Sequence, residues 1–205
     1  MCDRVASLDA RTRVLVLQDP HEPDVVLGTV QILQAALPGC TVAVGRQWSS
    51  LADALGEAPG DGRWGVLWRA SLPEGVDVDA LPGPVAVLDR AGRPRPAGHA
   101  LAGIVALDGT WSQAKSLWWR NPWLLQLDRV VVTPGEPGIY GKLRREPNRL
   151  AVSTLEAVAE ALVANGESPE VRASLRRWMR TLVQRARDTD PRKGRAGGPG
   201  GADVG

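Results

Sequence analysis

Short apolar runs recur along the chain, and segments with helical periodicity separate several of them. The runs cover residues 13–17, 41–44, 64–68, 84–88, 103–107 and 129–133. Continuous apolar runs are typical of strands buried on both faces, and strands that alternate with helices usually pair in parallel. The order therefore predicts an α/β fold, with a mainly parallel sheet that helices cover on both faces.

Helices are predicted where apolar residues recur every three to four positions. They cover residues 25–37, 49–58 and 153–164, and a last one begins at Ser168-Pro169-Glu170. Pro38-Gly39 ends the first of them, and Ser49 or Ser50 caps the second. The last helix has an apolar stripe of Val171, Leu175, Met179, Leu182 and Val183. Five arginines lie mostly off this stripe. They form either a solvated helix face or a surface that contacts an RNA backbone.

The length of 205 residues is enough for one substantial core. Residues 1–12 are interpreted as an N-terminal lead, residues 13–187 as the folded domain and residues 188–205 as a basic tail. The tail consists mainly of proline, glycine and charged residues, which cannot bury a core. We therefore expect the tail to be disordered.

The composition excludes several classes of protein. Cys2 and Cys40 are far apart and cannot form a disulfide framework or a structural zinc site, so no metal is expected. No apolar run is long enough to span a membrane, and the first residues lack the apolar core of a signal peptide. These features favour a soluble cytoplasmic protein with no membrane partner.

The net charge is only +2, but the two halves of the chain differ. Residues 1–110 hold nine basic and thirteen acidic residues, and residues 111–205 hold sixteen and ten. The basic half is where a polyanion would dock, although arginines scattered over a solvated surface produce the same asymmetry.

Asp108-Gly109-Thr110-Trp111 stands where an apolar run gives way to an apparent helix. A carboxylate and a hydroxyl beside a glycine, at the start of a helix with unpaired N–H groups, can form the corner of a reaction centre. Helix capping by Asp108 or Thr110 is the structural alternative. Trp111 could stack on a base, but a tryptophan at the start of a helix more often packs in the core, and the same holds for Trp118, Trp119 and Trp123. Trp118 and Trp119 are adjacent, so both cannot face fully inward.

Further segments extend this corner into an ordered set of motifs. They are Gln18-Asp19-Pro20-His21-Glu22, Asn121-Pro122-Trp123-Leu124, the basic segment Tyr140 to Pro147, and Leu150 to Ala157, which contains Ser-Thr-x-Glu-Ala. Together with Asp108 to Lys115, this set resembles the DTW-domain family over roughly residues 13–165. The resemblance implies transfer of the 3-amino-3-carboxypropyl group from S-adenosylmethionine to uridine in tRNA. It also implies a SPOUT-like fold with a C-terminal knot.

The sequence departs from the family pattern at two points. Asp19 stands where the family has the histidine of a His-Pro-x-Glu element, so no role of that histidine is carried over. The cysteine-rich N-terminal segment of many members has no counterpart in this sequence.

The resemblance and the residue chemistry together give a set of candidate site residues. Asp108, Thr110 and Trp111 are the catalytic candidates, with Asp108 orienting the base or handling the N3 proton. The candidates for binding S-adenosylmethionine are Leu67, Trp68, Leu107, Arg144, Ser153 and Thr154. The candidates for binding substrate RNA are Glu22, Lys115, Lys142 and Arg145. Ser153 and Glu156 also have the spacing of a capping box.

Other functions remain compatible with the sequence. They are the same transfer to ribosomal RNA or a small molecule, an RNA methyltransferase on the same scaffold, and RNA binding without catalysis. The sequence does not indicate a tRNA position or an oligomeric state.

Overall fold

A computed structural model of the chain describes residues 5–21, 28–68, 83–96, 100–133, 138–139 and 153–188. Its strands are β1 (Arg13–Gln18), β2 (Cys40–Val44), β3 (Trp64–Trp68), β4 (Val85–Leu88), β5 (Gly103–Asp108) and β6 (Asp128–Val132). Its helices are α1 (Val30–Ala36), α2 (Leu51–Leu55), α3 (Trp111–Arg120), the 3-10 helix η2 (Pro122–Gln126), α4 (Thr154–Ala164) and α5 (Pro169–Asp188).

The strands form one sheet in the order β2-β1-β5-β3-β6-β4. Every neighbouring pair is parallel except β4 and β6, which are antiparallel. β1 and β5 lie side by side although distant in sequence, and their register pairs Gln18 with Asp108. The last residues of these two parallel strands therefore meet at one edge of the sheet.

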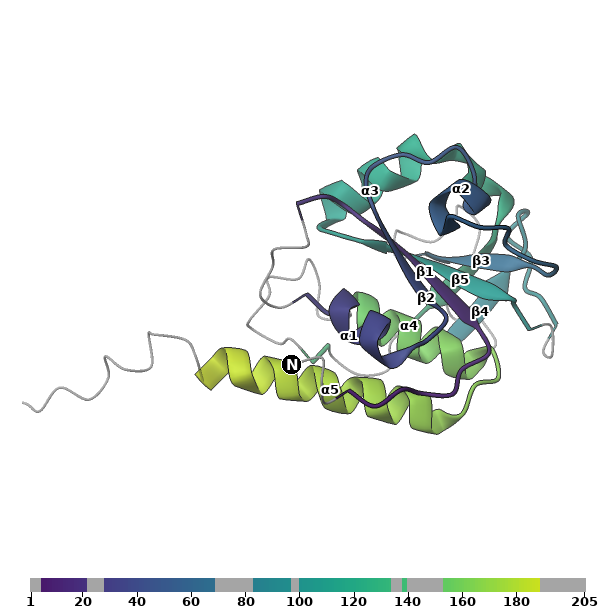
Figure 1. Cartoon of the computed structure of the whole chain (residues 1–205). Helices are drawn as coiled ribbons and strands as arrows, with labels where there is room; N and C mark the ends of the chain where they lie inside the picture. Colours follow the sequence, from purple (N-terminus) through teal and green to yellow (C-terminus); the bar gives the residue numbers. More distant parts are fainter. Residues whose placement is uncertain are drawn as a thin grey trace, which may run out of the picture.

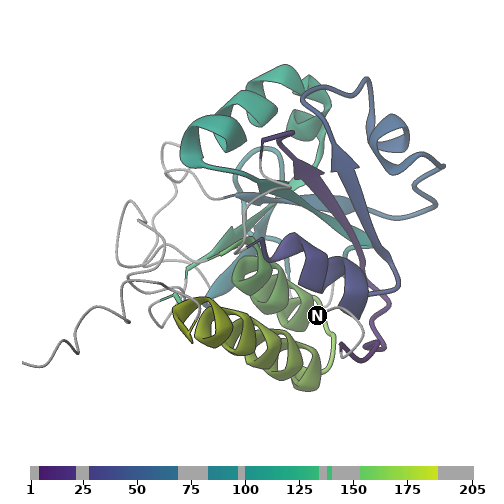
Figure 2. The same ribbon diagram turned by 60° about the vertical axis from the view of Figure 1, so that its left-hand side comes forward.

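Helices cover both faces of the sheet, as the sequence predicts. Figures 1 and 2 show α1, α4 and α5 on one face and α2 and α3 on the other. The alternation of side chains along each strand creates this division. In β1, Val14 and Val16 pack in the core under α1, α4 and α5, whereas Leu15 and Leu17 pack in the core under α2 and α3.

A polar network fixes the amino end of the sheet to the far end of α4. Asn165, which follows α4, donates from Nδ2 to the carbonyl of Leu101 and to Thr12 Oγ1, both at 2.9 Å. Glu167 accepts hydrogen bonds from the backbone N–H and the hydroxyl of Thr12. Because Thr12 and Leu101 precede β1 and β5, α4 ends at the amino edge of the sheet. Its first residues therefore lie toward the carboxyl edge.

The structure confirms the predicted fold class and refines the element bounds. The first helix begins at Val30 rather than Val25, since Gly28 and Thr29 lie outside it and Thr29 forms no side-chain cap. In α5 the predicted stripe is buried at Val171, Leu175, Met179 and Val183, with Leu182 partly buried. The predicted tail from residue 189 onward lies outside the described residues. So does most of residues 134–152, and the predicted C-terminal knot stays a prediction.

Candidate functional site

The crevice at the carboxyl ends of β1 and β5 is the place where this topology favours a ligand. The connection after β1 leads to α1 on one face of the sheet, and the connection after β5 leads to α3 on the other. Adjacent parallel strands whose connections diverge in this way leave a crevice at their carboxyl ends. Gln18 and Asp19 lie at the carboxyl end of β1, and Asp108 and Gly109 lie at that of β5, where this crevice is expected.

Asp108 is buried at this edge, and its carboxylate is held by Gln18. The side-chain Nε2 of Gln18 donates to Asp108 Oδ2 at 3.0 Å. The backbone N–H of Asp19 donates to the carbonyl of Asp108 at 3.1 Å, which extends the strand pairing by one step. Alternation along the strands turns Gln18 and Asp108 toward the face that carries α1 and α4. Asp108 is the last residue of β5 and does not cap α3.

Asp19 is a second buried carboxylate in the same crevice, and it joins three segments of the chain. Its Oδ1 accepts from the backbone N–H of His21 at 3.1 Å, from His21 Nδ1 at 2.9 Å and from Gln113 Nε2 at 3.3 Å. Arg46 Nε lies 3.6 Å from its Oδ2. A carboxylate can only accept, so Nδ1 of His21 carries the proton in this contact. The 3.3 Å contact between Arg46 and His21 Nδ1 is therefore not a hydrogen bond.

The surroundings of Asp19 keep it ionised. Burial alone would raise the pKa of this carboxyl group, but the hydrogen bonds from His21 and the charge of Arg46 outweigh it. The net result is a pKa below the ordinary value for aspartate. The crevice therefore contains a fixed negative charge next to the Asp108 backbone.

Thr110 is the N-cap of α3, so the capping interpretation is confirmed for this residue. Its Oγ1 accepts from the backbone N–H of Gln113 at 3.4 Å, and Gln113 Oε1 accepts from the N–H of Thr110 at 2.6 Å. The two bonds form a capping box. Gln113 thus ties the start of α3 to Asp19. A ligand role of Thr110 stays a prediction.

The tryptophans of α3 divide between its two sides. Trp111 is 44% exposed and Trp119 is 71% exposed, whereas Trp118 packs against the core under α2 and α3. Core packing is therefore wrong for Trp111 and Trp119. The expectation that Trp118 and Trp119 cannot both face inward is confirmed. Lys115 is also exposed on α3.

Asn121 anchors the loop that carries Arg46 to the end of α3. Its side chain is fully buried, accepts from the N–H of Trp48 at 2.8 Å and donates to the carbonyls of Arg46 and Leu117. Trp123 Nε1 donates to the carbonyl of Trp48 at 3.1 Å. The Asn-Pro-Trp segment thus positions the backbone around Arg46, which in turn faces Asp19.

The start of α4 approaches the same edge from the face to which Asp108 points. Ser153 and Glu156 form the predicted capping box, with Glu156 Oε2 accepting from the N–H and the hydroxyl of Ser153. Glu156 Oε1 also accepts from the N–H of Ile139 at 3.0 Å. Ser153 and Thr154 are both buried. The sequence thus brings a capped helix terminus to the carboxyl edge.

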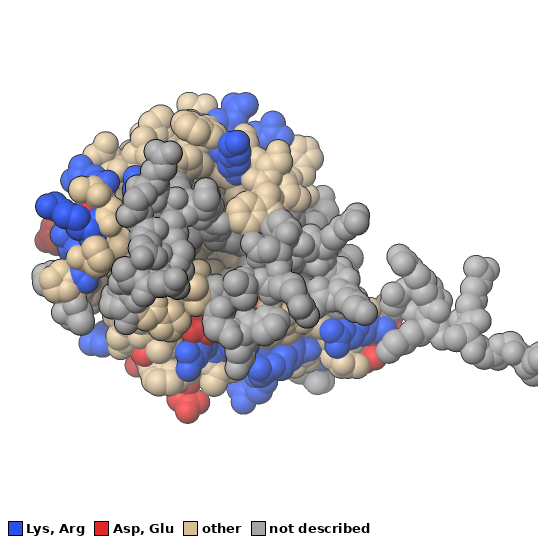
Figure 3. All heavy atoms as spheres, turned by 180° about the vertical axis from the view of Figure 1, so that it is seen from behind, with Lys and Arg blue, Asp and Glu red and all other residues tan. Residues whose placement is uncertain are grey.

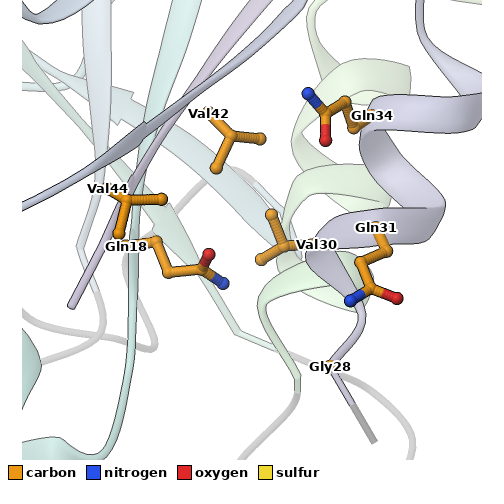
Figure 4. Close-up of a pocket in the computed structure, with 7 residues that line it drawn as sticks. All are labelled: Gln18, Gly28, Val30, Gln31, Gln34, Val42 and Val44. Carbon is orange, nitrogen blue, oxygen red and sulfur yellow. The ribbon is translucent and has the colours of Figure 1, made fainter. Parts of the chain in front are cut away.

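A pocket of about 260 Å³ lies between α1 and the ends of β1 and β2. Figure 4 shows Gln18 beside the valines of this pocket, with the amides of Gln31 and Gln34 on the α1 side. Its lining residues are Gln18, Gly28, Val30, Gln31, Gln34, Val42 and Val44. Because Gln18 lines the pocket and also binds Asp108, a ligand in this pocket would lie one side chain away from that carboxylate.

The remaining candidates are only partly placed by the structure. Leu67 is buried on the α1 and α4 side, whereas Leu107 is buried on the α2 and α3 side, so their side chains do not meet. Trp68 ends β3 and pairs with Val131 through its backbone. The predicted residues Glu22, Lys142, Arg144 and Arg145 lie outside the described residues.

Within the residues that the structure describes, no three His, Cys, Asp or Glu side chains gather closely enough to hold a metal ion. The expected absence of a metal stays a prediction. No helix in this part of the chain is both long and apolar enough to cross a membrane.

Comparison with known proteins gives the motif set its context. Residues 1–187 match the DTW domain. The chain belongs to the DTW domain family. It is 30% identical to the tRNA-uridine aminocarboxypropyltransferase 2 of Mus musculus over 161 residues. This alignment covers 77% of this chain and 49% of the mouse protein. The chain is 27% identical over 178 residues to the protein of the same name from Macaca fascicularis, covering 85% and 55%.

A shorter match extends to insects. The tRNA-uridine aminocarboxypropyltransferase 2 of Drosophila melanogaster is 35% identical over 81 residues, which cover 40% of this chain and 32% of that protein. The chain spans about half the length of the two mammalian relatives that it matches. No solved structure matches it.

Several residues of the crevice at the carboxyl ends of β1 and β5 were not predicted from the sequence. Gln18, Arg46 and Gln113 were not among the candidates, and Asp19 was noted only as a departure from the family motif. A usable signal was present, because Gln18 and Asp19 are polar residues at the end of a buried strand. The same description fits Asp108 in the Asp-Gly-Thr-Trp motif, and carboxyl ends of parallel strands meet at one edge.

Proposed function

We propose that this protein transfers the 3-amino-3-carboxypropyl group from S-adenosylmethionine to N3 of uridine in tRNA, in the cytoplasm, and releases methylthioadenosine. Membership of the DTW domain family and the names of the mammalian relatives support a transfer of this kind. The observation that carries the proposal is the Asp108 carboxylate of the DTW motif, held by Gln18 in the sheet crevice.

The reaction forms a carbon–nitrogen bond, breaks a carbon–sulfur bond and releases the proton of N3. Uridine N3 attacks the γ-carbon of the methionine arm, the bond from that carbon to sulfur breaks, and the electron pair leaves with methylthioadenosine. The positive sulfonium already activates its three attached carbons, so the reaction needs no metal. The protein has to present the γ-carbon, rather than the methyl group, in line with the nucleophile.

In this proposal Asp108 orients the uracil by accepting a hydrogen bond from N3–H. An ordinary aspartate, with a pKa of roughly 4, is a weak base for an imide proton. The proton becomes more acidic as N3 gives up electron density to the new bond, so proton transfer to the carboxylate becomes easier along the reaction. Asp108 therefore acts first as an acceptor and then takes the proton.

The remaining candidates receive roles as part of the same proposal. The ends of β3 and β5, at Leu67, Trp68 and Leu107, contact the nucleoside of S-adenosylmethionine through their backbones. Ser153 and Thr154 approach its amino-acid arm, and Arg144 binds its carboxylate. RNA contacts are assigned to Glu22, Lys115, Lys142 and Arg145. The proposal includes the C-terminal knot that the family resemblance implies.

The test combines the purified protein, S-adenosylmethionine labelled in its methionine arm, a chelator, and tRNA that lacks the modification. Nucleoside mass analysis should show aminocarboxypropyl uridine, with one methylthioadenosine per transfer. S-adenosylhomocysteine as the co-product would instead identify a methyltransferase. RNA binding without either co-product would leave a non-catalytic RNA-binding protein. Ribosomal RNA and free uridine, supplied separately, test the alternative acceptors.

A further inference from the structure

Trp119 has the largest exposed fraction among the large apolar side chains that the structure describes, with 71% of its surface open to solvent. Tryptophan usually buries most of its area when it stabilises a fold. Trp119 contributes little to the core, which Trp118 and Leu117 reach from the same helix. An indole left in water on the rigid surface of a helix is a common feature of binding sites.

Trp119 belongs to a stripe that begins at the candidate site. An α-helix turns about 100° per residue, so Trp111, Lys115 and Trp119 follow each other at steps of roughly 40°. The first and last of them are about 12 Å apart along the axis, at a rise of roughly 1.5 Å per residue. Trp111, Lys115 and Trp119 are all exposed, and this stripe is the α3 outer face. Arg120, also exposed, borders it about 100° around the helix from Trp119.

The charge of this face has one sign. Residues 109–127 contain Lys115 and Arg120 and no acidic residue. Arg120 is steadied by a hydrogen bond of 3.2 Å from its Nε to Ser116 Oγ. Figure 3 shows basic side chains over the end of the molecule that carries α3, amid uncharged ones. Flat aromatic faces next to cations suit nucleic acid, because bases stack on the rings and phosphates pair with the cations.

We propose that the α3 outer face docks single-stranded RNA next to the reaction centre. Bases stack on Trp119 and Trp111, the phosphate between them contacts Lys115, and Arg120 contacts a phosphate beyond Trp119. The axial separation of roughly 12 Å between positions 111 and 119 corresponds to about three to four base steps of about 3.4 Å. Because α3 begins three residues after Asp108, a strand lying along this face leads a flipped-out uridine into the crevice. This inference rests on the proposed function for the identity of the RNA.

The test measures the affinity of the full chain for an unmodified tRNA transcript and for a short oligouridylate by fluorescence anisotropy across salt. Trp119→Ala should weaken binding of both by about five- to 100-fold, with an unchanged salt slope. Trp119→Tyr should restore most of the affinity, because a flat ring remains. Lys115→Gln should lower the slope of log affinity against log salt by about 0.7 for the oligouridylate.

Leu125→Ala is the matched control, since Leu125 is also exposed, at 49%, in the neighbouring η2, but has no ring to stack. It should leave RNA affinity unchanged. All variants should melt like the parent protein, because these side chains contribute little to the core. Unchanged RNA affinity in Trp119→Ala would overturn the proposal. So would a loss of self-association in Trp119→Ala with RNA affinity retained, because the face would then bind a protein chain.

The two proposals fail separately. If the parent protein forms modified uridine while Trp119→Ala binds RNA normally, the docking face is wrong and the transferase remains. If RNA affinity depends on Trp119 but no aminocarboxypropyl group is transferred, the docking face remains and the transferase is wrong.

Discussion

Gln18 donates a hydrogen bond of 3.0 Å to Asp108 across 90 residues of sequence, and both side chains are buried at the end of their strands. The register of β1 and β5 makes the two residues direct neighbours. An amide donor fixes the direction of the carboxylate without neutralising it. The pair therefore presents an oriented negative charge in the crevice, next to the pocket that Gln18 also lines.

Asp108→Asn should leave the fold intact and reduce transfer by about 10²- to 10⁴-fold, the usual contribution of a positioned acid or base. The asparagine oxygen can still accept from Gln18, so the change removes charge with little change of shape. Transfer rates under single-turnover conditions and affinity for S-adenosylmethionine measure the two effects. Asp61→Asn, at an exposed carboxylate, is the control and should be silent. Wild-type transfer by folded Asp108→Asn would restrict Asp108 to a structural role.

Gln18→Glu should make transfer strongly pH-dependent. It places a second carboxylate about 3 Å from Asp108, and two such groups cannot both ionise easily, so one of the two pKa values rises. The rising limb of the pH–rate profile should therefore shift to higher pH than in the parent protein. Gln18→Leu removes the donor without adding charge, so it should lower the rate with a much smaller shift. Identical profiles for both variants would show that Gln18 only fills space.

The fold could be predicted from the sequence because buried parallel strands leave continuous apolar runs. The start of β3 at Trp64 and the capping box of α4, Ser153 and Glu156, follow from local sequence patterns. The crevice could not be predicted in the same way. Nothing in the local pattern states that β1 lies beside β5, so the contacts of Gln18 and Asp19 with the DTW corner depend on strand order. The sequence predicts that Trp118 and Trp119 cannot both face inward, since two adjacent tryptophans cannot share one side of a helix. It does not predict which of the two is exposed.

Gly109→Ala should destabilise the protein and disturb the Asp108 corner. Gly109 has a φ of 151°, and an added Cβ would lie 2.9 Å from Gln113 Cβ. Strain of this kind costs of order 1–3 kcal/mol. Gly56→Ala is the matched control, because its φ is 73° but nothing lies within 4 Å of the added Cβ. Urea denaturation should show a larger loss for Gly109→Ala. Equal losses would assign the whole effect to backbone conformation and none to the contact with Gln113.

Asp19 should contribute a pH-dependent part of the stability. Its pKa lies below the ordinary value because the His21 hydrogen bonds and the Arg46 charge outweigh burial. A carboxyl group of this kind stabilises the fold fully above its unfolded pKa, near 3.9. The contribution is lost as the pH falls through the lower folded pKa. Asp19→Asn should therefore be less stable than the parent at pH 7, and the difference should shrink below about pH 4.

Urea midpoints of both proteins between pH 7 and pH 3 measure this difference. His21→Ala provides a second variant, because it removes the side-chain donor and keeps the carboxylate. In His21→Ala, the pKa of Asp19 in the folded protein should move back toward the ordinary value. The stability deficit of this variant against the parent should therefore also shrink below about pH 4. A deficit of Asp19→Asn that stays constant over the whole range would mean that the carboxylate acts through shape alone. The charge of Asp19 would then contribute nothing to stability through His21 and Arg46.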